Sequence, residues 1–243
     1  MISLEKFNSY PEYTCYSDLV NQVDPNNSPQ IILTHRASNQ INSSCKKLGI
    51  FSGSFNPITL AHSKMIEIAH QCYEFDEILL LIAKANVDKG VFGLPIEARL
   101  LTLKLHAKNQ SNISIGISSH GRYIDKIAAL KQIYPKHTEF NFIVGYDTLV
   151  RIFDPKYYND IQDELTTLFM ECKFIVANRK GVSIHDIKQF LNQPHLRSYQ
   201  EFIEYINLPD FYADLSSTDI RNRIDAGEKI SHLVPPSITY FFD

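Results

Sequence analysis

The chain has 243 residues, of which 44% are apolar and 21% charged. This composition is ordinary for a globular protein with a buried core. Its formal net charge of −3 disfavours non-specific binding to nucleic acid or to an anionic membrane, because both need an excess of basic residues. We therefore expect neither as a partner.

The cysteines and the N-terminal stretch indicate in which cellular compartment the protein works. Cys15, Cys45, Cys72 and Cys172 include no C-x-x-C pair, so we expect neither a zinc site nor a disulfide framework, and a reducing environment is favoured. The first residues are polar and interrupted by Pro11, unlike a signal peptide. No apolar run approaches the roughly 18 residues of a membrane-spanning helix. These features predict a cytoplasmic protein.

The chain divides into a polar beginning and a periodic remainder. Residues 1–45 are rich in Asn, Ser, Gln and Pro, with one apolar patch at Ile31–His35. We interpret them as an N-terminal extension of unknown role that could hold a strand or two. The regular pattern of a domain spans residues 46–243.

Within that domain, short apolar runs alternate with helical patterns. The runs that predict strands are residues 48–53, Glu77–Ala83, Asn112–Ser118, Glu139–Gly145, Cys172–Asn178 and, as a sixth candidate, Glu201–Leu208. The patterns that predict helices are Ile58–Tyr73, Ile96–Ala107, Tyr123–Ile133 and two pieces after Ser217 separated by Pro235 and Pro236. This alternation predicts an α/β fold, a Rossmann-like doubly wound and mainly parallel sheet with helices on both faces. Such a sheet binds ligands beyond the carboxyl ends of its strands.

The first predicted strand ends in the turn G-S-F-N-P, which leads straight into a helix. Gly53 allows a tight turn and a close approach to the backbone, while Asn56 suits the N-cap and Pro57 the first helical position. Thr59 and His62 share one face near the helix start, where free N–H groups and the helix dipole favour an anion. The alternative is that His62 is simply a half-buried polar residue.

A second polar stretch opens a helix near the end of the chain. Ser216, Ser217 and Thr218 are followed by Asp219, which is a strong capping signal. Arg221 lies one turn after Ser217, so its guanidinium could bind a phosphate held by the backbone N–H groups of the helix start. Neither G-x-x-x-x-G-K-[ST] nor G-x-G-x-x-G is present, which disfavours an ordinary P-loop ATPase or dinucleotide dehydrogenase. On its own the triplet would be only a capped surface helix.

Together the two stretches resemble a known family, the nucleotidylyltransferases, and within them the nicotinamide or nicotinate mononucleotide adenylyltransferases. The family pattern G-x-F-x-P-x-[HT]-x-G-H is matched by Gly53, Phe55, Pro57, Thr59 and His62. The pattern I-S-S-T-x-I-R is matched by Ser216, Ser217, Thr218, Ile220 and Arg221. Three further segments are similar to family segments: "FIVGYDTL" with Asp147, "VANRKG" with Arg179, and "LVPPSITYF". Ala61, Leu215 and Tyr146 stand where the family has Gly, Ile and Ala.

The resemblance implies an adenylyltransferase that joins the AMP moiety of ATP to nicotinamide or nicotinate mononucleotide, giving NAD or deamido-NAD and pyrophosphate. It implies Mg²⁺ bound with ATP and names no protein side chain as a metal ligand. The implied catalytic residues are Thr59, His62 and Arg221. The implied ATP-binding residues are Gly53, Ser54, Phe55, His62, Asp147, Ser217, Thr218 and Arg221. The implied mononucleotide-binding residues are Lys89 and Arg179.

Several alternatives stay open at this point. Lys89 could equally be a solvated surface lysine, Phe92 and Tyr157 are only candidates for stacking on the pyridine ring, and residues 151–158 could line the pocket or merely pack. Another enzyme of the superfamily, adenylylating phosphopantetheine or transferring a cytidylyl group, is the main alternative function. A non-catalytic nucleotide-binding module is the second. The sequence does not distinguish the acid from the amide mononucleotide, nor does it give the oligomeric state or the metal preference.

Overall fold

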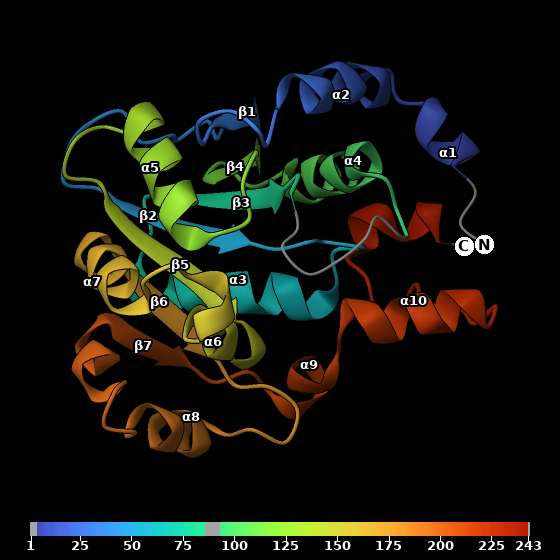
Figure 1. The fold of residues 1–243 in the computed structure, drawn as a ribbon. Helices are drawn as coiled ribbons and strands as arrows, with labels where there is room; N and C mark the ends of the chain where they lie inside the picture. The colour runs from blue at the N-terminus through green and yellow to red at the C-terminus, as the bar shows by residue number, and fades with distance from the viewer. Residues whose placement is uncertain (1–3, 86–92, 243) are drawn as a thin grey trace.

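The structure is a computed structural model that describes residues 4–85 and 93–242 (Figure 1). Lys89 and Phe92, which the sequence suggested as ligand contacts, lie outside the described residues. The strands are β1 Ile31–His35, β2 Lys47–Ser52, β3 Glu77–Ala83, β4 Ile113–Ser118, β5 Glu139–Gly145, β6 Cys172–Ala177 and β7 Ile203–Ile206. The α-helices are α1 Glu5–Asn8, α2 Pro11–Gln22, α3 Leu60–Tyr73, α4 Ile96–Ala107, α5 Tyr123–Ile133, α6 Tyr146–Ile152, α7 Ile161–Glu171, α8 Ile184–Leu191, α9 Asp210–Asp214 and α10 Ser217–Asp225. The short 3₁₀ helices are η1 Pro155–Tyr157, η2 Arg197–Phe202 and η3 Pro236–Phe241.

In the described part of the chain, seven strands form one sheet in the order β1-β4-β3-β2-β5-β6-β7. Every neighbouring pair is parallel except β1, which runs antiparallel to β4 at one edge. The chain builds outward from β2 through β3 and β4, then returns to the other side of β2 with β5. The strand order therefore reverses between β2 and β5, where a doubly wound sheet opens a crevice at its carboxyl ends.

Helices cover both faces of this sheet because the strands are apolar on both sides. The buried side chains of α2, α3, α4 and α10 form one apolar cluster. Those of α5, α6, α7 and α8 form a second cluster on the opposite face. The inner strand β3 is buried along most of its length. The predicted Rossmann-like fold is confirmed.

The N-terminal segment contains more structure than its polar composition suggested. The strand expected near Ile31–His35 is present as β1, but the twelve-residue helix α2 was not predicted. Its buried residues Tyr16 and Val20 lie four apart, a helical spacing that is hard to see among Ser, Thr and Asn. Lys84, just after β3, donates to the carbonyl oxygens of Val20 and Val23, at 2.7 Å each. This contact ties the end of α2 to the sheet.

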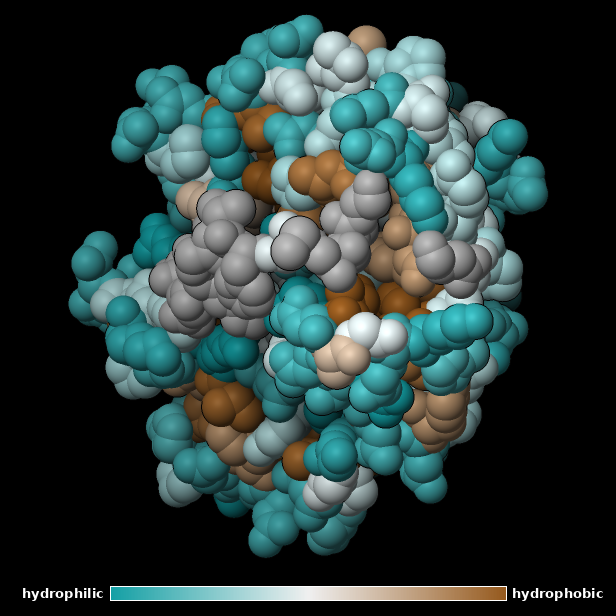
Figure 2. Space-filling view, turned by 90° about the vertical axis from the view of Figure 1, so that its right-hand side faces the viewer, coloured by the Kyte–Doolittle hydropathy of each residue, from teal (hydrophilic) through white to brown (hydrophobic). Residues whose placement is uncertain are grey.

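The C-terminal segment returns to the helices on the first face. Phe241 of η3 stacks on Phe7 of α1, with ring centroids 4.2 Å apart. In Figure 1, α10 lies beside the start of α3, at the end of the molecule toward which β2 and β3 point. Figure 2 looks onto this end, where apolar surface shows at the middle of a largely hydrophilic face. Among the described helices, none has both the length and the apolar composition needed to cross a membrane.

Candidate active site

The helix α3 begins two residues later than predicted. Its N-cap is Thr59, not Asn56, and its first residue is Leu60. Asn56 is buried, and its Oδ1 accepts a hydrogen bond from the backbone N–H of Leu94 at 2.9 Å, a partner 38 residues away. That distant partner takes the side chain away from the helix start, so the prediction for Asn56 was wrong and Thr59 caps the helix instead.

Thr59 and His62 form a closed pair at the start of α3. The backbone N–H of Thr59 donates to Nδ1 of His62 at 3.0 Å, and Oγ1 of Thr59 lies 2.8 Å from the same nitrogen. In return, the backbone N–H of His62 donates to Oγ1 of Thr59. A backbone N–H can only donate, so Nδ1 must accept, and the neutral ring carries its proton on Nε2. His62 therefore offers an N–H donor on the side away from Thr59.

The surroundings of His62 favour this neutral form. Its ring packs against the rings of Phe51 and Phe55, with ring centroids 5.5 and 5.3 Å away. Burial, with smaller contributions from the charges of Arg179 and His106, lowers the pKa of His62 to about 3. At neutral pH the imidazole is a hydrogen-bond donor without a charge of its own.

The turn before α3 directs the ring of Phe55 into the core, while Gly53 and Ser54 line the cavity beside it. Phe55 has a φ of +42°, and its ring is fully buried. A left-handed conformation costs a bulky residue about 1–3 kcal/mol, and the burial of the ring offsets this cost. A ligand at this turn would meet the backbone of Gly53, Ser54 and Phe55, while the Phe55 ring stays in the core.

The start of α10 docks directly onto this turn. Oγ of Ser217 donates to the carbonyl oxygen of Pro57 at 3.0 Å, and Nη1 of Arg221 donates to that of Asn56 at 2.9 Å. Nη2 of Arg221 also donates to Oγ1 of Thr218 at 2.9 Å. Ser216 caps α10 by accepting the N–H of Asp219, as the sequence predicted. The starts of α3 and α10, each with the positive end of its helix dipole, thus meet at one place.

A second guanidinium joins Arg221 at this place. Arg99 is 8% exposed; its Nε donates to the carbonyl oxygen of Leu94 at 2.6 Å and its Nη1 to that of Ser54 at 3.5 Å. Burial, and then the positive charge of Arg221, lowers the pKa of Arg99 to about 10. Two cations that repel each other in a partly buried site are stabilised when an anion binds between them.

Arg179 and Asp147 face each other across the ends of β5 and β6. Nε of Arg179 lies 3.4 Å from Oδ2 of Asp147, and its Nη1 donates to the carbonyl oxygen of Leu215, just before α10. The structure therefore brings both residues to the α10 side of the crevice. Neither lines the cavity described next, although the sequence suggested Arg179 as a mononucleotide contact.

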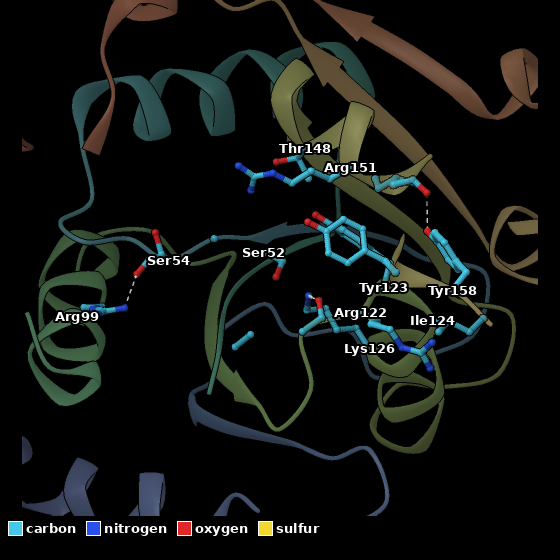
Figure 3. Close-up of a pocket in the computed structure, with 15 residues that line it drawn as sticks. Ser52, Ser54, Arg99, Arg122, Tyr123, Ile124, Lys126, Thr148, Arg151 and Tyr158 are labelled. Atoms are coloured by element: carbon cyan, nitrogen blue, oxygen red, sulfur yellow. Dashed lines mark hydrogen bonds between the residues drawn. The ribbon is translucent and has the colours of Figure 1, made fainter. Parts of the chain in front are cut away.

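A cavity of about 270 Å³ opens beside the turn, beyond the carboxyl ends of β2, β3 and β4. In Figure 3, Ser54 and Arg99 lie at one end of it and Tyr123, Ile124, Lys126 and Tyr158 at the other. The residues that line it are Ser52, Gly53, Ser54, Ala83, Arg99, Gly121, Arg122, Tyr123, Ile124, Lys126, Thr148, Arg151, Ile152, Tyr157 and Tyr158. Its size and its mixed aromatic and polar lining are typical of a small-ligand site.

The start of α5 contributes cavity residues that the sequence analysis did not identify. Arg122, Tyr123 and Lys126 follow β4 directly, so a search of every strand's carboxyl end would have found them. Lys126 is 4% exposed, and burial lowers the pKa of its ammonium to about 8, although the nearby Asp125 opposes that shift. The segment that includes Arg151 and Tyr157, for which pocket lining and packing were both open, does line the cavity.

The side chains at the crevice suit anions better than cations. Among residues 4–85 and 93–242, no group of three or more His, Cys, Asp and Glu side chains could hold a metal ion. The groups that converge there are N–H donors and guanidinium groups, notably those of Arg99 and Arg221. A Mg²⁺ ion at this place would fit only as the partner of bound phosphate oxygens and water, which is its usual preference.

The chain matches a family of nucleotide-transferring proteins over most of its length. The Cytidylyltransferase-like family matches residues 50–223. A probable nicotinate-nucleotide adenylyltransferase of Fusobacterium nucleatum is 30% identical over 194 residues, which cover 77% of this chain and 92% of that protein. The chain belongs to the cytidylyltransferase-like family and, within it, to the nicotinate-nucleotide adenylyltransferases. The family recognised from the sequence is confirmed.

Other similar proteins extend this adenylyltransferase match. A probable nicotinate-nucleotide adenylyltransferase of Geobacter sulfurreducens is 28% identical over 218 residues, covering 81% of this chain and 95% of that protein. A Plasmodium falciparum nicotinic acid mononucleotide adenylyltransferase, solved in complex with NaAD, has a TM-score of 0.59 at 22% identity and covers 80% of this chain and 94% of its own. Another Plasmodium structure, complexed with APC, has a TM-score of 0.57 at 21% identity and the same coverage. At these identities the structures show a shared fold.

Proposed function

We propose that this protein transfers the AMP moiety of ATP to nicotinate mononucleotide, with release of pyrophosphate. The docking of α10 on the turn before α3, through Ser217 and Arg221, carries the proposal. It joins two helix N-termini, a neutral histidine donor and two arginines beside a cavity large enough for a small ligand. The acid form of the mononucleotide is the one named for the relatives.

The reaction needs positioning and charge stabilisation rather than a protein nucleophile. An oxygen of the mononucleotide 5′-phosphate attacks the α-phosphorus of ATP and forms a new P–O bond. The bond between that phosphorus and the oxygen bridging to the β-phosphate breaks, and pyrophosphate leaves with the electron pair. Negative charge grows on the leaving group, so fixed N–H donors beside it lower the barrier.

The two helix starts would hold the triphosphate. Nε2–H of His62 would donate to the phosphate oxygens, oriented by the bonds from Thr59 to Nδ1. Ser217, Thr218 and Arg221 would bind the β- and γ-phosphates at the start of α10. The backbone N–H groups of Ser54 and Phe55 would face the triphosphate from the turn, next to Gly53, whose own N–H donates to the carbonyl oxygen of Leu81. Mg²⁺ bound with ATP would neutralise part of the phosphate charge.

The two ends of the crevice would take the two nucleosides. The Arg179–Asp147 pair, beside α10, would contact the adenosine part of ATP, so Arg179 serves ATP rather than the mononucleotide in this proposal. The cavity would take the mononucleotide, with its phosphate near Ser54 and Arg99 and its ring near Tyr157. Lys89 stays a predicted contact to that phosphate.

Product analysis tests this function directly. Purified protein is incubated with ATP and Mg²⁺ and, in parallel, with nicotinate mononucleotide, nicotinamide mononucleotide or phosphopantetheine, and CTP replaces ATP in a further set. The proposal expects deamido-NAD and an equal amount of pyrophosphate from ATP and the nicotinate compound. Product from CTP or phosphopantetheine would assign another reaction of the superfamily. Binding of ATP without pyrophosphate release from any acceptor would indicate a binding module.

A further inference from the structure

One buried cation in the cavity has fewer hydrogen-bond partners than its chemistry requires. Lys126, in the second turn of α5, is 4% exposed and lines the cavity. An ammonium carries three N–H donors. Within the described residues, its Nζ donates to one acceptor, the carbonyl oxygen of Gly121, and lies 4.7 Å from the centroid of the Tyr123 ring. Within those same residues its other two N–H donors have no hydrogen-bond acceptor, so they are available to water or to a ligand in the cavity.

The charges around Lys126 do not neutralise it. Asp125, whose charge acts on the pKa of Lys126, is paired with Nε of Arg122 at 3.1 Å. Arg122 also pairs with Glu164 at 2.9 Å, so two carboxylates offset its charge. Arg151, the other cation at this end, forms no ion pair in the described part of the chain, but its side chain is exposed to solvent. Lys126 is thus a desolvated charge that has no ion pair with any residue that the structure describes.

The position of Lys126 decides which part of a mononucleotide it meets. The 5′-phosphate must reach ATP at the α3 and α10 starts, near Ser54 and Arg99. Lys126 lies at the opposite end of the cavity, with Tyr123, Ile124 and Tyr158 (Figure 3). A mononucleotide that spans the cavity therefore places its pyridine ring, not its phosphate, beside Lys126. The substituent on that ring is a carboxylate in the acid and a neutral amide in the other form.

We propose that Lys126 is the specificity-determining residue that selects nicotinate over nicotinamide mononucleotide by pairing with the ring carboxylate. The inference rests on the proposed function and extends it to one side chain. A bound carboxylate accepts the free N–H donors of Lys126 and neutralises its charge. A bound amide leaves a buried charge uncompensated, which is costly in a site of low polarity. The positive end of the α5 helix dipole also favours a bound carboxylate over a neutral amide.

The test compares three variants on both substrates. Lys126→Met keeps the length of the side chain and removes the charge. Lys131→Met is the matched control, because Lys131 lies on the same helix but is exposed and pairs with Glu171 at the surface. Arg151→Met tests the other cation at this end of the cavity. For each protein, kcat/KM is measured with nicotinate and with nicotinamide mononucleotide at saturating ATP and Mg²⁺.

We expect Lys126→Met to lower kcat/KM for nicotinate mononucleotide at least about tenfold, because one charge-assisted pair is lost. For nicotinamide mononucleotide, kcat/KM should change less than about threefold. Lys131→Met should change neither, and Arg151→Met should not alter the ratio between them. An equal loss on both substrates, an unchanged ratio, or a ratio that depends on Arg151 alone would overturn it.

A binding measurement separates this inference from the proposed function. Isothermal titration gives the Kd of each mononucleotide without ATP, for the wild-type protein and for Lys126→Met. Tighter binding of the acid to the wild-type protein, lost in the variant, supports the role of Lys126 even if no dinucleotide forms. Equal affinity of the wild-type protein for both mononucleotides would overturn it even if the adenylyl transfer is confirmed. Thermal unfolding verifies that each variant is folded.

Discussion

The two ends of the crevice are held together by different kinds of contact. At the α3–α10 end, segments about 160 residues apart are joined by side chains that donate to backbone carbonyl oxygens, as Ser217 does to Pro57. At the α5–α6 end, the cavity is lined by rings and by cations, and one cation, Lys126, is buried with no ion pair among residues 4–85 and 93–242. The contacts at the first end are formed before any ligand binds. At the second end, the charge of the buried cation is offset only when an anionic ligand binds.

This difference separates what each end contributes. A preformed set of donors can stabilise charge that appears during the reaction, because it needs no reorganisation. A cavity with an unsatisfied cation discriminates between ligands, because only one of them removes the cost of the buried charge. We therefore expect substitutions at the α3–α10 end to lower turnover, and substitutions at the α5–α6 end to change affinity and selectivity.

The largest expected effect is that of His62→Ala. Loss of the Nε2–H donor should lower kcat at least about 10²-fold, as for removal of a transition-state donor, with a small change in KM for the mononucleotide. Pyrophosphate release measures the rate. The matched control is His185→Ala, in which an exposed histidine of α8 is removed. Turnover close to wild type in a folded His62→Ala protein would exclude His62 from the mechanism.

Arg221→Gln should have the next largest effect. It removes a positive charge and the two hydrogen bonds to Asn56 and Thr218, so kcat/KM for ATP should fall about 10- to 100-fold. Arg223→Gln, two residues further along α10, removes an exposed arginine that pairs with Glu228 and should change little. Similar losses in both variants would show that α10 acts only through its overall charge.

Tyr157→Ala probes the α5–α6 end. Removal of the ring should raise KM for the mononucleotide about tenfold, a typical effect for one aromatic contact, and leave KM for ATP and kcat nearly unchanged. Tyr157→Phe keeps the ring and should behave like the wild-type protein. A fall in kcat without a change in KM would contradict the separation of roles between the two ends.

The smallest expected effect is a dependence of the free energy of unfolding on pH, caused by His62 at the α3–α10 end. The pKa of His62 is about 3 in the folded chain, against 6.5 for an unperturbed histidine. Between these values the unfolded chain binds more protons at this position, so the free energy of unfolding falls as pH falls through the window. Above about pH 6.5 the full stabilisation that the neutral His62 contributes to folding is present.

Urea unfolding of the wild-type protein and of His62→Gln at several pH values between 4 and 7 measures this contribution. The variant lacks the group, so its free energy of unfolding should depend less steeply on pH. Identical slopes would show that His62 is not held neutral by its surroundings. The same pKa predicts that the rate of the wild-type enzyme shows no inflection from His62 between pH 5 and 8.

The sequence was informative where function depends on local pattern. The alternation of strands and helices predicted β3, α4, α5 and β5 with the same boundaries that the structure has. The resemblance carried by the two motifs implied that both stretches bind ATP, and the structure places the starts of α3 and α10 in contact. The helix α2 was missed because its apolar residues are few and spaced among polar ones.

The sequence was uninformative where function depends on distant partners. The side chain of Asn56 bonds to Leu94, a partner that no local rule reveals, so the cap of α3 was misassigned. The cavity draws on β2, β3, α4, α5, α6 and η1, and the stretch containing Arg122, Tyr123 and Lys126 has no spacing that marks it as a site. Only the fold shows that Lys126 is buried and that Arg122 is already paired.

The contacts of Ser217 and Arg221 have a consequence for synthesis on the ribosome. Their partners Pro57 and Asn56 emerge 160 and 165 residues earlier. A nascent chain that has made its whole parallel sheet still lacks the α10 half of the proposed triphosphate site, and long-range contacts of this kind form late. A chain released before α10 would therefore fold its sheet without the contacts that join α10 to the turn before α3.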